Sequence, residues 1–144
     1  MIRPVTKGNL PAIVRLLREL WPTESLTADE MAPVLDRDLH DNDYEIFCFE
    51  KDTVLGIITV SKRWAFFHRG RVGVIEELVV SEGWRGQGIG KKLTRFIEDR
   101  LCQQGITAVE LTSDLRRKQT HRFWEHLVYE RRAFQFRKRM RHRQ

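Results

Sequence analysis

The sequence has few cysteines and no long apolar segment. Its 144 residues include two cysteines, Cys48 and Cys102, and no pair has the C-x-x-C spacing of zinc sites. A metal site is therefore not expected, and a reducing compartment such as the cytoplasm is the simplest setting. The longest apolar run, residues 54–60, is interrupted by Gly56 and Thr59. It is far shorter than the ~20 residues of a membrane span, which excludes an integral membrane helix.

The N-terminus also lacks the features of a secretory signal. The first ten residues, MIRPVTKGNL, contain neither a long apolar stretch nor a small-residue cleavage site. Apolar residues make up 41% of the chain, which is too many for global disorder. The length fits one domain with a single core, so we expect one domain over residues 1–144.

Charge is distributed unevenly along the chain. The net charge is +6, and residues 131–144 hold seven Arg or Lys and no acid, so the other 130 residues carry a net charge of −1. Residues 24–52 hold ten acids and two bases. We interpret the basic end as a terminal strand with a solvated face rather than a nucleic-acid arm. The acidic segment is either an exposed helix and loop or a surface that attracts a cationic substrate.

Apolar periodicity predicts the order of strands and helices. Asn9 and Pro11 are typical of a helix start, and Gly105 is typical of a helix end. The pattern predicts strands at residues 2–5, 44–50, 54–61, 72–80, 108–112 and 134–140, and helices at 9–20, 24–39, 89–101 and 116–128. The helix at 24–39 is expected to break near Pro33. This order predicts an α/β protein with a mixed sheet and helices on both faces.

A glycine-rich turn follows the strand expected at residues 72–80. Residues 74–93 read VIEELVVSEGWRGQGIGKKL, and the turn itself is RGQGIG from Arg85 to Gly90. Its glycines let the backbone approach a ligand closely, and the following helix start adds partial positive charge. Lys91 and Lys92 add full charges beside it. We therefore predict an anion site, most naturally for a diphosphate.

Two common diphosphate motifs do not fit this turn. A Walker A loop requires glycine at position 85 and serine or threonine at position 92, where this chain has Arg85 and Lys92. A dinucleotide-binding fingerprint requires glycine at position 91 or 93, where this chain has Lys91 and Leu93. What remains is an R-x-x-G-x-G turn after an apolar strand.

This turn resembles the pyrophosphate loop of the GNAT N-acetyltransferase superfamily, which binds acetyl-CoA. Residues 112–129, TSDLRRKQTHRFWEHLVY, resemble the second signature of the family. Within them the pattern from Arg117 to Phe123 is most similar to the branch of the aminoalkylphosphonate and small-amine N-acetyltransferases. The resemblance spans essentially the whole chain. It implies the acyl-CoA N-acyltransferase fold, a mixed, mostly antiparallel central sheet flanked by helices on both faces. It also implies transfer of an acetyl group from acetyl-CoA to a primary amine by direct attack in a ternary complex.

The resemblance assigns acetyl-CoA to two stretches of the chain. In the family, the strand before the loop splays from its neighbour and the pantetheine arm adds to its edge. That implies the backbone groups of Leu78, Val79 and Val80, with the N–H of Val79 polarising the thioester carbonyl. The pyrophosphate is expected on Arg85, Gly86, Gln87, Gly88, Ile89, Gly90 and Lys91. Arg117 replaces an Asn that binds pantetheine in many relatives, and we expect it to bind CoA.

Two adjacent glutamates are candidates for the catalytic base. An amine with a lysine-like pKa is neutral in only about one molecule in 10³ at pH 7, so a carboxylate that relays its proton accelerates attack. Glu76 matches the base position of polyamine-acetylating relatives, and Glu77 matches an acid common in this branch. Alternation along a strand predicts that the two face opposite sides of the sheet. We expect Glu76 to be the base and keep Glu77 as its competitor.

The residue at the usual general-acid position also differs. The family commonly has a Tyr there, and this chain has Trp124, whose indole N–H cannot hand over a proton near neutral pH. Three explanations remain open: a thiolate that takes its proton from water, His121 acting as the acid one turn earlier, or a chain that binds CoA with little catalysis. Val128 likewise stands where the family usually has Gly.

The resemblance leaves the acceptor and the partners open. A cationic small-molecule amine, a basic peptide and a zwitterionic aminophosphonate all fit it. We expect a homodimer and no membrane, nucleic-acid or metal partner. Residues 62–71, KRWAFFHRGR, either line the acceptor site or form a dimer contact. The alternative function is a CoA-binding regulatory module, or a nucleic-acid- or protein-binding module, with little catalysis.

Overall fold

The computed structural model describes residues 1–141 and divides into two compact units that meet in sequence at residues 111 and 112. The first unit contains β1 (Ile2–Pro4), α1 (Leu10–Leu20), α2 (Ala28–Leu39), β2 (Tyr44–Glu50), β3 (Val54–Ala65), β4 (Gly70–Val80), α3 (Ile89–Gln103) and β5 (Val109–Leu111), with short 3₁₀ turns at Lys7–Asn9 and Glu82–Trp84. The second unit contains α4 (Lys118–His126). Within residues 1–141, no helix is both long enough and apolar enough to cross a membrane.

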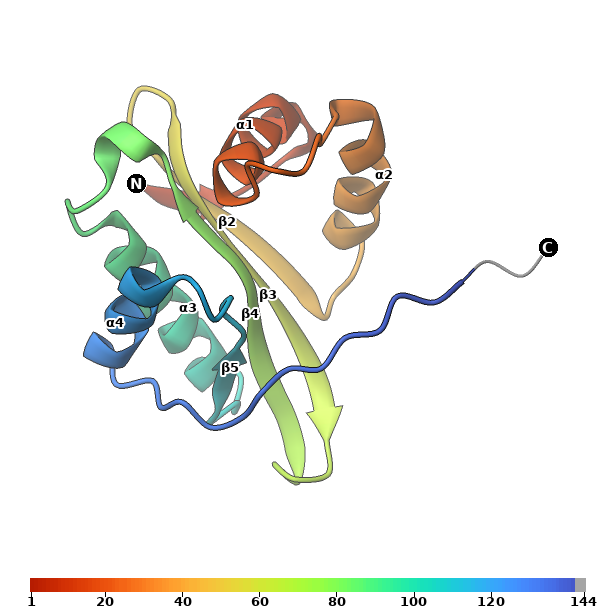
Figure 1. Ribbon diagram of the computed structural model, residues 1–144, viewed down its shortest axis with the longest axis vertical. Coiled ribbons are helices and arrows are strands. Elements are labelled where there is room, and N and C mark those ends of the chain that lie inside the picture. The colour runs from red at the N-terminus through yellow and green to blue at the C-terminus, as the bar shows by residue number, and fades with distance from the viewer. Residues whose placement is uncertain (142–144) are drawn as a thin grey trace. The chain divides into compact units, whose positions relative to one another are not determined.

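The five strands form one sheet whose spatial order is the order of the sequence. Strands β1 to β4 are antiparallel neighbours, and β5 is parallel to β4. Figure 1 shows α1 and α2 together on one side of this sheet and α3 on the other. The mixed, mostly antiparallel sheet with helices on both faces is therefore confirmed.

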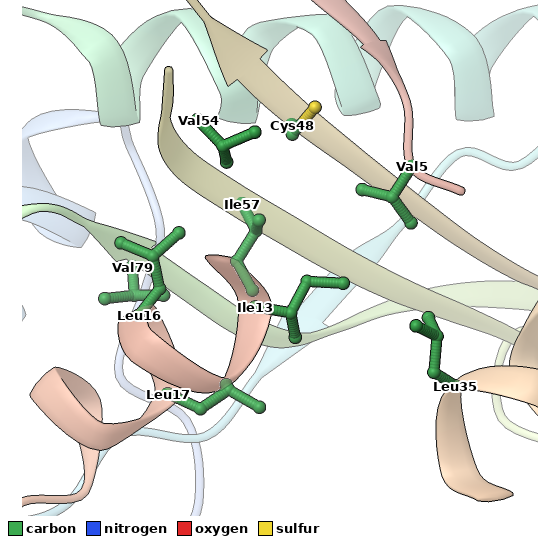
Figure 2. Packing of buried hydrophobic residues seen from close by; sticks show 9 residues of the cluster. All are labelled: Val5, Ile13, Leu16, Leu17, Leu35, Cys48, Val54, Ile57 and Val79. Carbon is green, nitrogen blue, oxygen red and sulfur yellow. The ribbon is translucent and has the colours of Figure 1, made fainter. Parts of the chain in front are cut away.

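The sheet face beneath α1 and α2 is apolar over most of its length. Ile13, Leu16 and Leu17 recur at helical spacing along α1 and are buried against the strands. Figure 2 shows the core that they form with Val5, Leu35, Cys48, Val54, Ile57 and Val79. Burial of one such aliphatic side chain contributes roughly 1.5–3 kcal/mol, so this core fixes both helices on the sheet.

The second helix begins later than predicted and is not broken. The Thr27 hydroxyl accepts the N–H of Glu30 at 3.2 Å, and the Glu30 carboxylate accepts the N–H of Thr27 at 3.2 Å. This capping box places the start of α2 at Ala28 rather than at residue 24. Pro33 lies inside the helix, against the prediction of a break. It removes one hydrogen bond near the exposed start of the helix, which the remaining turns tolerate.

The opposite face of the sheet packs on α3. The rings of Phe47 and Phe96 lie 4.8 Å apart in an edge-on arrangement. A Cβ atom on Gly73 would lie 2.5 Å from Leu101 Cδ1, so this glycine is what allows α3 to approach β4 so closely. The stripe of apolar residues predicted along this helix is buried at Leu93, Ile97 and Leu101.

A buried ionic cluster lies on the same α3 face. The Glu45 carboxylate accepts hydrogen bonds from Arg100 and Gln104 and lies 3.1 Å from Lys62 Nζ. Burial tends to raise the pKa of Glu45, but the hydrogen bonds from Arg100, Gln104 and Lys62 outweigh it, so this pKa lies below its ordinary value. Each of the buried charges thus has a partner of opposite sign.

The predicted terminal strand at residues 134–140 is wrong. Residues 130–141 contain neither helix nor strand, and Figure 1 draws them as an extended blue trace. The side chains of Phe134, Phe136 and Met140 are exposed. An alternating pattern becomes a strand only where another strand supplies hydrogen bonds and a surface to bury the apolar side chains, and none among residues 1–141 pairs with this segment. Residues 142–144 of the basic end lie outside the described part of the chain.

Candidate active site

A bulge in β4 sets the geometry of the two candidate bases. Opposite β3, Glu77 pairs with Thr59, and Ile75 pairs with Val60. Glu76 lies between them without a partner and is the extra residue of a β-bulge. Such a bulge interrupts the alternation of side chains along a strand, so the two glutamates need not face opposite sides.

Both carboxylates in fact lie on one face of the sheet. The Thr59 hydroxyl donates to Glu77 Oε1 at 2.6 Å, and the Ser61 hydroxyl donates to Glu76 Oε1 at 2.8 Å. Thr59 and Ser61 are two residues apart on β3 and therefore share a face. Tyr44 pairs with Ser61 across β2 and β3 and lies on this face too. The prediction that Glu76 and Glu77 point to opposite sides is therefore wrong.

This is the face that α1 and α2 cover, and α2 brings a third carboxylate to it. Burial raises the pKa of Glu77; the hydrogen bond from Thr59 opposes the rise, and the negative charges of Glu76 and Asp38 add to it. Burial, together with the charge of Asp41, raises the pKa of Asp38. The cluster of Asp38, Glu76 and Glu77 therefore concentrates negative charge at one end of the α1–α2 face.

Sequence reasoning missed two residues here, Asp38 of this cluster and Tyr44 beside it. Burial and the charge of Glu77 raise the pKa of Tyr44, which keeps its hydroxyl protonated beside the carboxylates. Asp38 belonged to the acidic segment at residues 24–52, but nothing in that segment distinguished it from its neighbours. Only the pairing of β2 with β3, and the placement of α2 over the sheet, assign either residue to the site.

Beyond the bulge, β4 has a free edge. Its pairing with β5 covers residues 73–75 only. On that side, residues 76–80 have no strand partner within the described part of the first unit. A strand edge of this kind presents unpaired backbone N–H and C=O groups to any extended ligand.

The direction of the backbone identifies which N–H groups face that edge. The N–H of Glu77 donates to the Thr59 hydroxyl at 2.9 Å, and the N–H of Ser81 donates to the Leu55 carbonyl at 2.7 Å. Both acceptors lie on β3. Because these directions alternate along a strand, the N–H of Val79 also faces β3, and those of Leu78 and Val80 face the free edge. The geometry favours Leu78 over Val79 as a donor to a ligand placed there.

The glycine-rich turn has the backbone conformation that an anion site requires. Gly86 and Gly88 have φ values of 79° and 86°, a region that favours glycine, and nothing lies within 4 Å of a Cβ built on either. Gly88 is the N-terminal cap of α3, and the first N–H bonded into the helix is that of Lys92, which donates to the Gly88 carbonyl. The N–H groups of the first turn are thus available to a ligand, beside the exposed Lys91.

The side chain of Arg85 holds this loop in place through hydrogen bonds within the first unit. Its Nε donates to the carbonyl of Val80 at 2.9 Å, and its Nη2 lies 3.4 Å from Glu19 Oε1. The same Glu19 oxygen accepts the N–H of Glu82 at 2.8 Å. Arg85 therefore ties the loop to the end of β4 and to α1, and part of its guanidinium is already engaged.

The second unit carries the other predicted residues on one short helix. Arg117 is the N-terminal cap of α4, and its carbonyl accepts the N–H of His121 at 3.0 Å. His121 Nε2 lies 2.7 Å from the carbonyl of Asp114, a contact that requires the hydrogen on this nitrogen. Trp124 is buried, and its ring packs edge-on against that of Tyr129 at 5.2 Å.

The end of α4 shows why the Val128 position matters. The N–H of Tyr129 donates to the carbonyl of Trp124 at 3.0 Å, and the N–H of Val128 donates to that of Glu125 at 2.9 Å. These two bonds define a Schellman motif, whose central residue is usually glycine. Val128 adopts the required left-handed conformation with a φ of 71°. The turn of the family signature is therefore formed despite the β-branched side chain.

The sheet is open and mixed, and its bulged fourth strand is free along one edge and leads into a glycine-rich helix start. This is the architecture of the acyl-CoA N-acyltransferases that the motifs implied. Comparison with known proteins agrees. Residues 10–128 match the model of the acetyltransferase (GNAT) family. The chain is 31% identical over 141 residues to the aminoalkylphosphonate N-acetyltransferase of Salmonella typhimurium, covering 95% of this chain and 89% of that protein.

Solved structures share the fold. A putative acetyltransferase from Agrobacterium tumefaciens has a TM-score of 0.87 at 22% identity, covering 97% of this chain and 99% of that one. The glucosamine-6-phosphate N-acetyltransferase of Arabidopsis thaliana has a TM-score of 0.82 at 23% identity, covering 98% of each chain. The protein belongs to the GNAT family and is an N-acetyltransferase, so the predicted family is confirmed.

Proposed function

We propose that the protein transfers the acetyl group of acetyl-CoA to a primary amine by direct attack in a ternary complex. The observation that carries the proposal is the bulge at Glu76. It brings Glu76 and Glu77 to one face, immediately before the strand edge that is free at Leu78 and Val80. A proton acceptor and a binding edge for an extended ligand are thus contiguous on one strand.

The residues present fit acetyl-CoA, which supplies an activated acetyl thioester. The N–H of Val80 would bind the pantetheine arm, and the N–H of Leu78 would donate to the acetyl carbonyl oxygen as charge develops on it. The turn from Gly86 to Lys91 would hold the pyrophosphate, with open space around both left-handed glycines. Arg117 remains a proposed phosphate ligand.

Glu77 is the better-placed proton acceptor. It is more buried than Glu76, and burial raises its pKa toward the neutral range in which a general base is most effective. Thr59 donates to one of its carboxylate oxygens, and the hydroxyl of Tyr44 lies close enough to the carboxylate to lower its pKa as well. Glu76 is exposed and hydrogen-bonded to Ser61, so we assign it, with Asp38, to holding the protonated amine. This reverses the roles expected from sequence.

The leaving thiolate does not require an acid from the protein. Thiols have a pKa of about 8.5, so the thiolate can depart and take its proton from water. The Trp124 indole cannot supply a proton, and one ring nitrogen of His121 already donates to Asp114. We propose a packing role for Trp124 against Tyr129 and a helix-start role for His121.

Two acceptor classes differ in the charge that they bring. The name of the Salmonella typhimurium relative specifies an aminoalkylphosphonate, which carries an anionic group. The cluster of Asp38, Glu76 and Glu77 repels an anion and attracts a cation. We therefore propose that amines without an anionic group are the preferred acceptors.

The test is thiol release from acetyl-CoA with a panel of amines that includes diamines and an aminoalkylphosphonate. Glu77→Gln is expected to lower kcat by about 10²–10⁴ near neutral pH, the usual contribution of a general base. Glu76→Gln is expected to raise KM more than it lowers kcat. Glu24→Gln, which removes an exposed acid near the start of the acidic segment, serves as the matched charge control.

The pH profile separates the two glutamates. With Glu77 as the base, kcat/KM falls as the pH drops through its raised pKa, because the carboxylate becomes protonated. Glu77→Gln removes that limb of the profile, and its activity recovers at high pH as the amine loses its proton unaided. An unchanged rate and profile in Glu77→Gln would contradict the assignment.

We also propose a homodimer in the cytoplasm. The β3–β4 hairpin exposes Trp64, Phe66 and Phe67, and aromatic residues are enriched at interfaces. Both cysteines, Cys48 and Cys102, are free thiols, which suits a reducing compartment. Sedimentation of the protein and of Phe66→Ser tests the dimer, because loss of a ring at the interface would favour the monomer.

A further inference from the structure

The basic C-terminal segment has the properties of a peptide substrate. Residues 131–141 contain six Arg or Lys and no acid, and every one of these residues is exposed. They form no helix or strand, and the only ion pair found for them within the described chain joins Arg131 to Glu125. An extended and exposed segment can enter a binding site without unfolding anything else.

Lys138 is the one primary amine in this segment. Its neighbours on both sides, Arg137 and Arg139, carry guanidinium groups that pair well with carboxylates. Guanidinium groups stay protonated in proteins, so they do not compete as nucleophiles. The segment therefore presents a single acceptor amine between two side chains that are permanently positively charged.

The proposed acceptor side of the protein is the complementary surface. Asp38, Glu76 and Glu77 form its carboxylate cluster, in which Arg37 is the cation found near Asp38. A cavity of about 540 Å³ lies beside it where α2 joins β2, lined by Asp36, Arg37, His40, Asp41, Asn42 and Asp43. Asp36 and Asp43 in this cavity already pair with Lys7 and Arg71, and Asp41 adds a third carboxylate that suits a guanidinium group beside a lysine.

We propose that Lys138 of one copy of this chain is an acetyl acceptor for the active site of another copy. The inference rests on the proposed function and names a lysine in a basic, extended peptide as its acceptor class. Lys138 Nζ would form the new C–N bond to the acetyl carbon as the thioester C–S bond breaks. Glu77 accepts one proton from the ammonium group before attack, and the second proton, released as the amide forms, passes to water while the sulfur departs as thiolate. The modification removes one positive charge from the segment.

The other lysines are less suited to this reaction. Lys7 pairs with Asp36 at 2.7 Å, Lys51 lies over the ring of Trp84, and Lys62 is buried beside Glu45. Lys91 and Lys92 belong to the proposed pyrophosphate turn, and Lys118 opens the first turn of α4. None of them lies in an extended segment of uniform charge.

Two full-length variants make a direct test. Glu77→Gln keeps Lys138 but lacks the proposed base, and Lys138→Arg keeps the base and the charge but lacks the amine. In a mixture of the two, Lys138→Arg is the enzyme and Glu77→Gln is the substrate. After incubation with acetyl-CoA, peptide mass spectrometry should find acetyl-Lys138 on the Glu77→Gln chain. Glu77→Gln incubated alone should show no acetyl-Lys138. The initial rate at Lys138 should exceed that at Lys118 and Lys51. Protein isolated from expressing cells should carry the same modification, and isolated Glu77→Gln should not.

A synthetic peptide of residues 131–141 tests the role of the flanking arginines. Used as a substrate for full-length Lys138→Arg, it should lose about tenfold in kcat/KM when Arg137 and Arg139 are replaced by Gln, because two exposed ion pairs are lost. The difference in kcat/KM between the two peptides should become smaller in high salt, because salt screens exposed ion pairs.

Each other outcome overturns the inference. Turnover of small amines by Lys138→Arg, without any acetyl-Lys138 in its mixture with Glu77→Gln, would contradict the inference but support the proposed function. Equal acetylation of all exposed lysines, with or without an active chain, would show simple chemical acetylation. Retention of RNA by the segment, without acetylation of Lys138, would assign it to nucleic acid instead. Absence of turnover on every amine and peptide, despite acetyl-CoA binding, would remove the proposed function itself.

Discussion

Replacing Val128 with glycine should stabilise the end of α4. Val128 adopts a left-handed backbone conformation with a φ of 71°, and its side chain is 87% exposed. A β-branched residue in that conformation is a genuine outlier, because its side chain crowds the following carbonyl. Since the side chain buries almost nothing, its removal loses no packing.

The size of the effect follows from two opposing contributions. Relief of the left-handed strain contributes roughly 1–2 kcal/mol, and the greater freedom of glycine in the unfolded chain takes back about 0.5–1 kcal/mol. We expect Val128→Gly to raise the free energy of unfolding by about 0.5–1 kcal/mol. For a chain of this size that corresponds to an increase in Tm of about 2–4 °C.

Differential scanning calorimetry measures this change, and hydrogen exchange at the amide of Tyr129 reports on the α4 end alone. Val128→Asn should reproduce most of the gain, because Asn tolerates the left-handed region. Val34→Gly is the matched control: Val34 is an exposed valine inside α2, where glycine should lower the stability by up to about 1 kcal/mol. If Val128→Gly lowers Tm, or leaves the exchange at Tyr129 unchanged, the strain argument is refuted.

Three further predictions concern the loop, the ionic cluster and the sheet. Gly88→Ala should weaken acetyl-CoA binding about fivefold by calorimetric titration, because alanine at a φ of 86° costs about 1 kcal/mol and displaces the N–H groups of the turn. Glu45→Gln should destabilise the fold by about 3 kcal/mol near neutral pH, since it leaves the buried Lys62 without its charged partner. The folded-state pKa of Glu45 lies below its ordinary value of 4.5, so the carboxylate's contribution is fully present above that pH and is lost as the pH falls through the folded pKa; urea titrations of both proteins should therefore converge in acid. Gly73→Ala should cost about 1–3 kcal/mol in urea unfolding, because the new Cβ would lie 2.5 Å from Leu101 Cδ1.

The sequence predicted most of the elements because their signals are local. Strand β2 has the predicted bounds, and α1 begins within one residue of the predicted start. Alternation and helical spacing are properties of neighbouring residues, so they survive without knowledge of the fold. The turn from Arg85 to Gly90 was found for the same reason, because the conformation of its glycines follows from their own lack of a side chain.

The site itself depended on how strands meet. The bulge at Glu76 exists only because Thr59 and Val60 pair with Glu77 and Ile75, a register that no local pattern of β4 reveals. Sequence alternation therefore placed the two glutamates on opposite faces, and tertiary pairing placed both on one.

The extended C-terminal segment also shows that a local sequence pattern does not determine strand pairing. Its alternation of Phe134 and Phe136 with polar residues is a valid strand pattern, yet no strand forms among the described residues. The sequence alone determined which segments could be helices or strands and which turn could bind a diphosphate. Only the tertiary structure decided which strands pair and in what register, because pairing energy comes from residues distant in sequence.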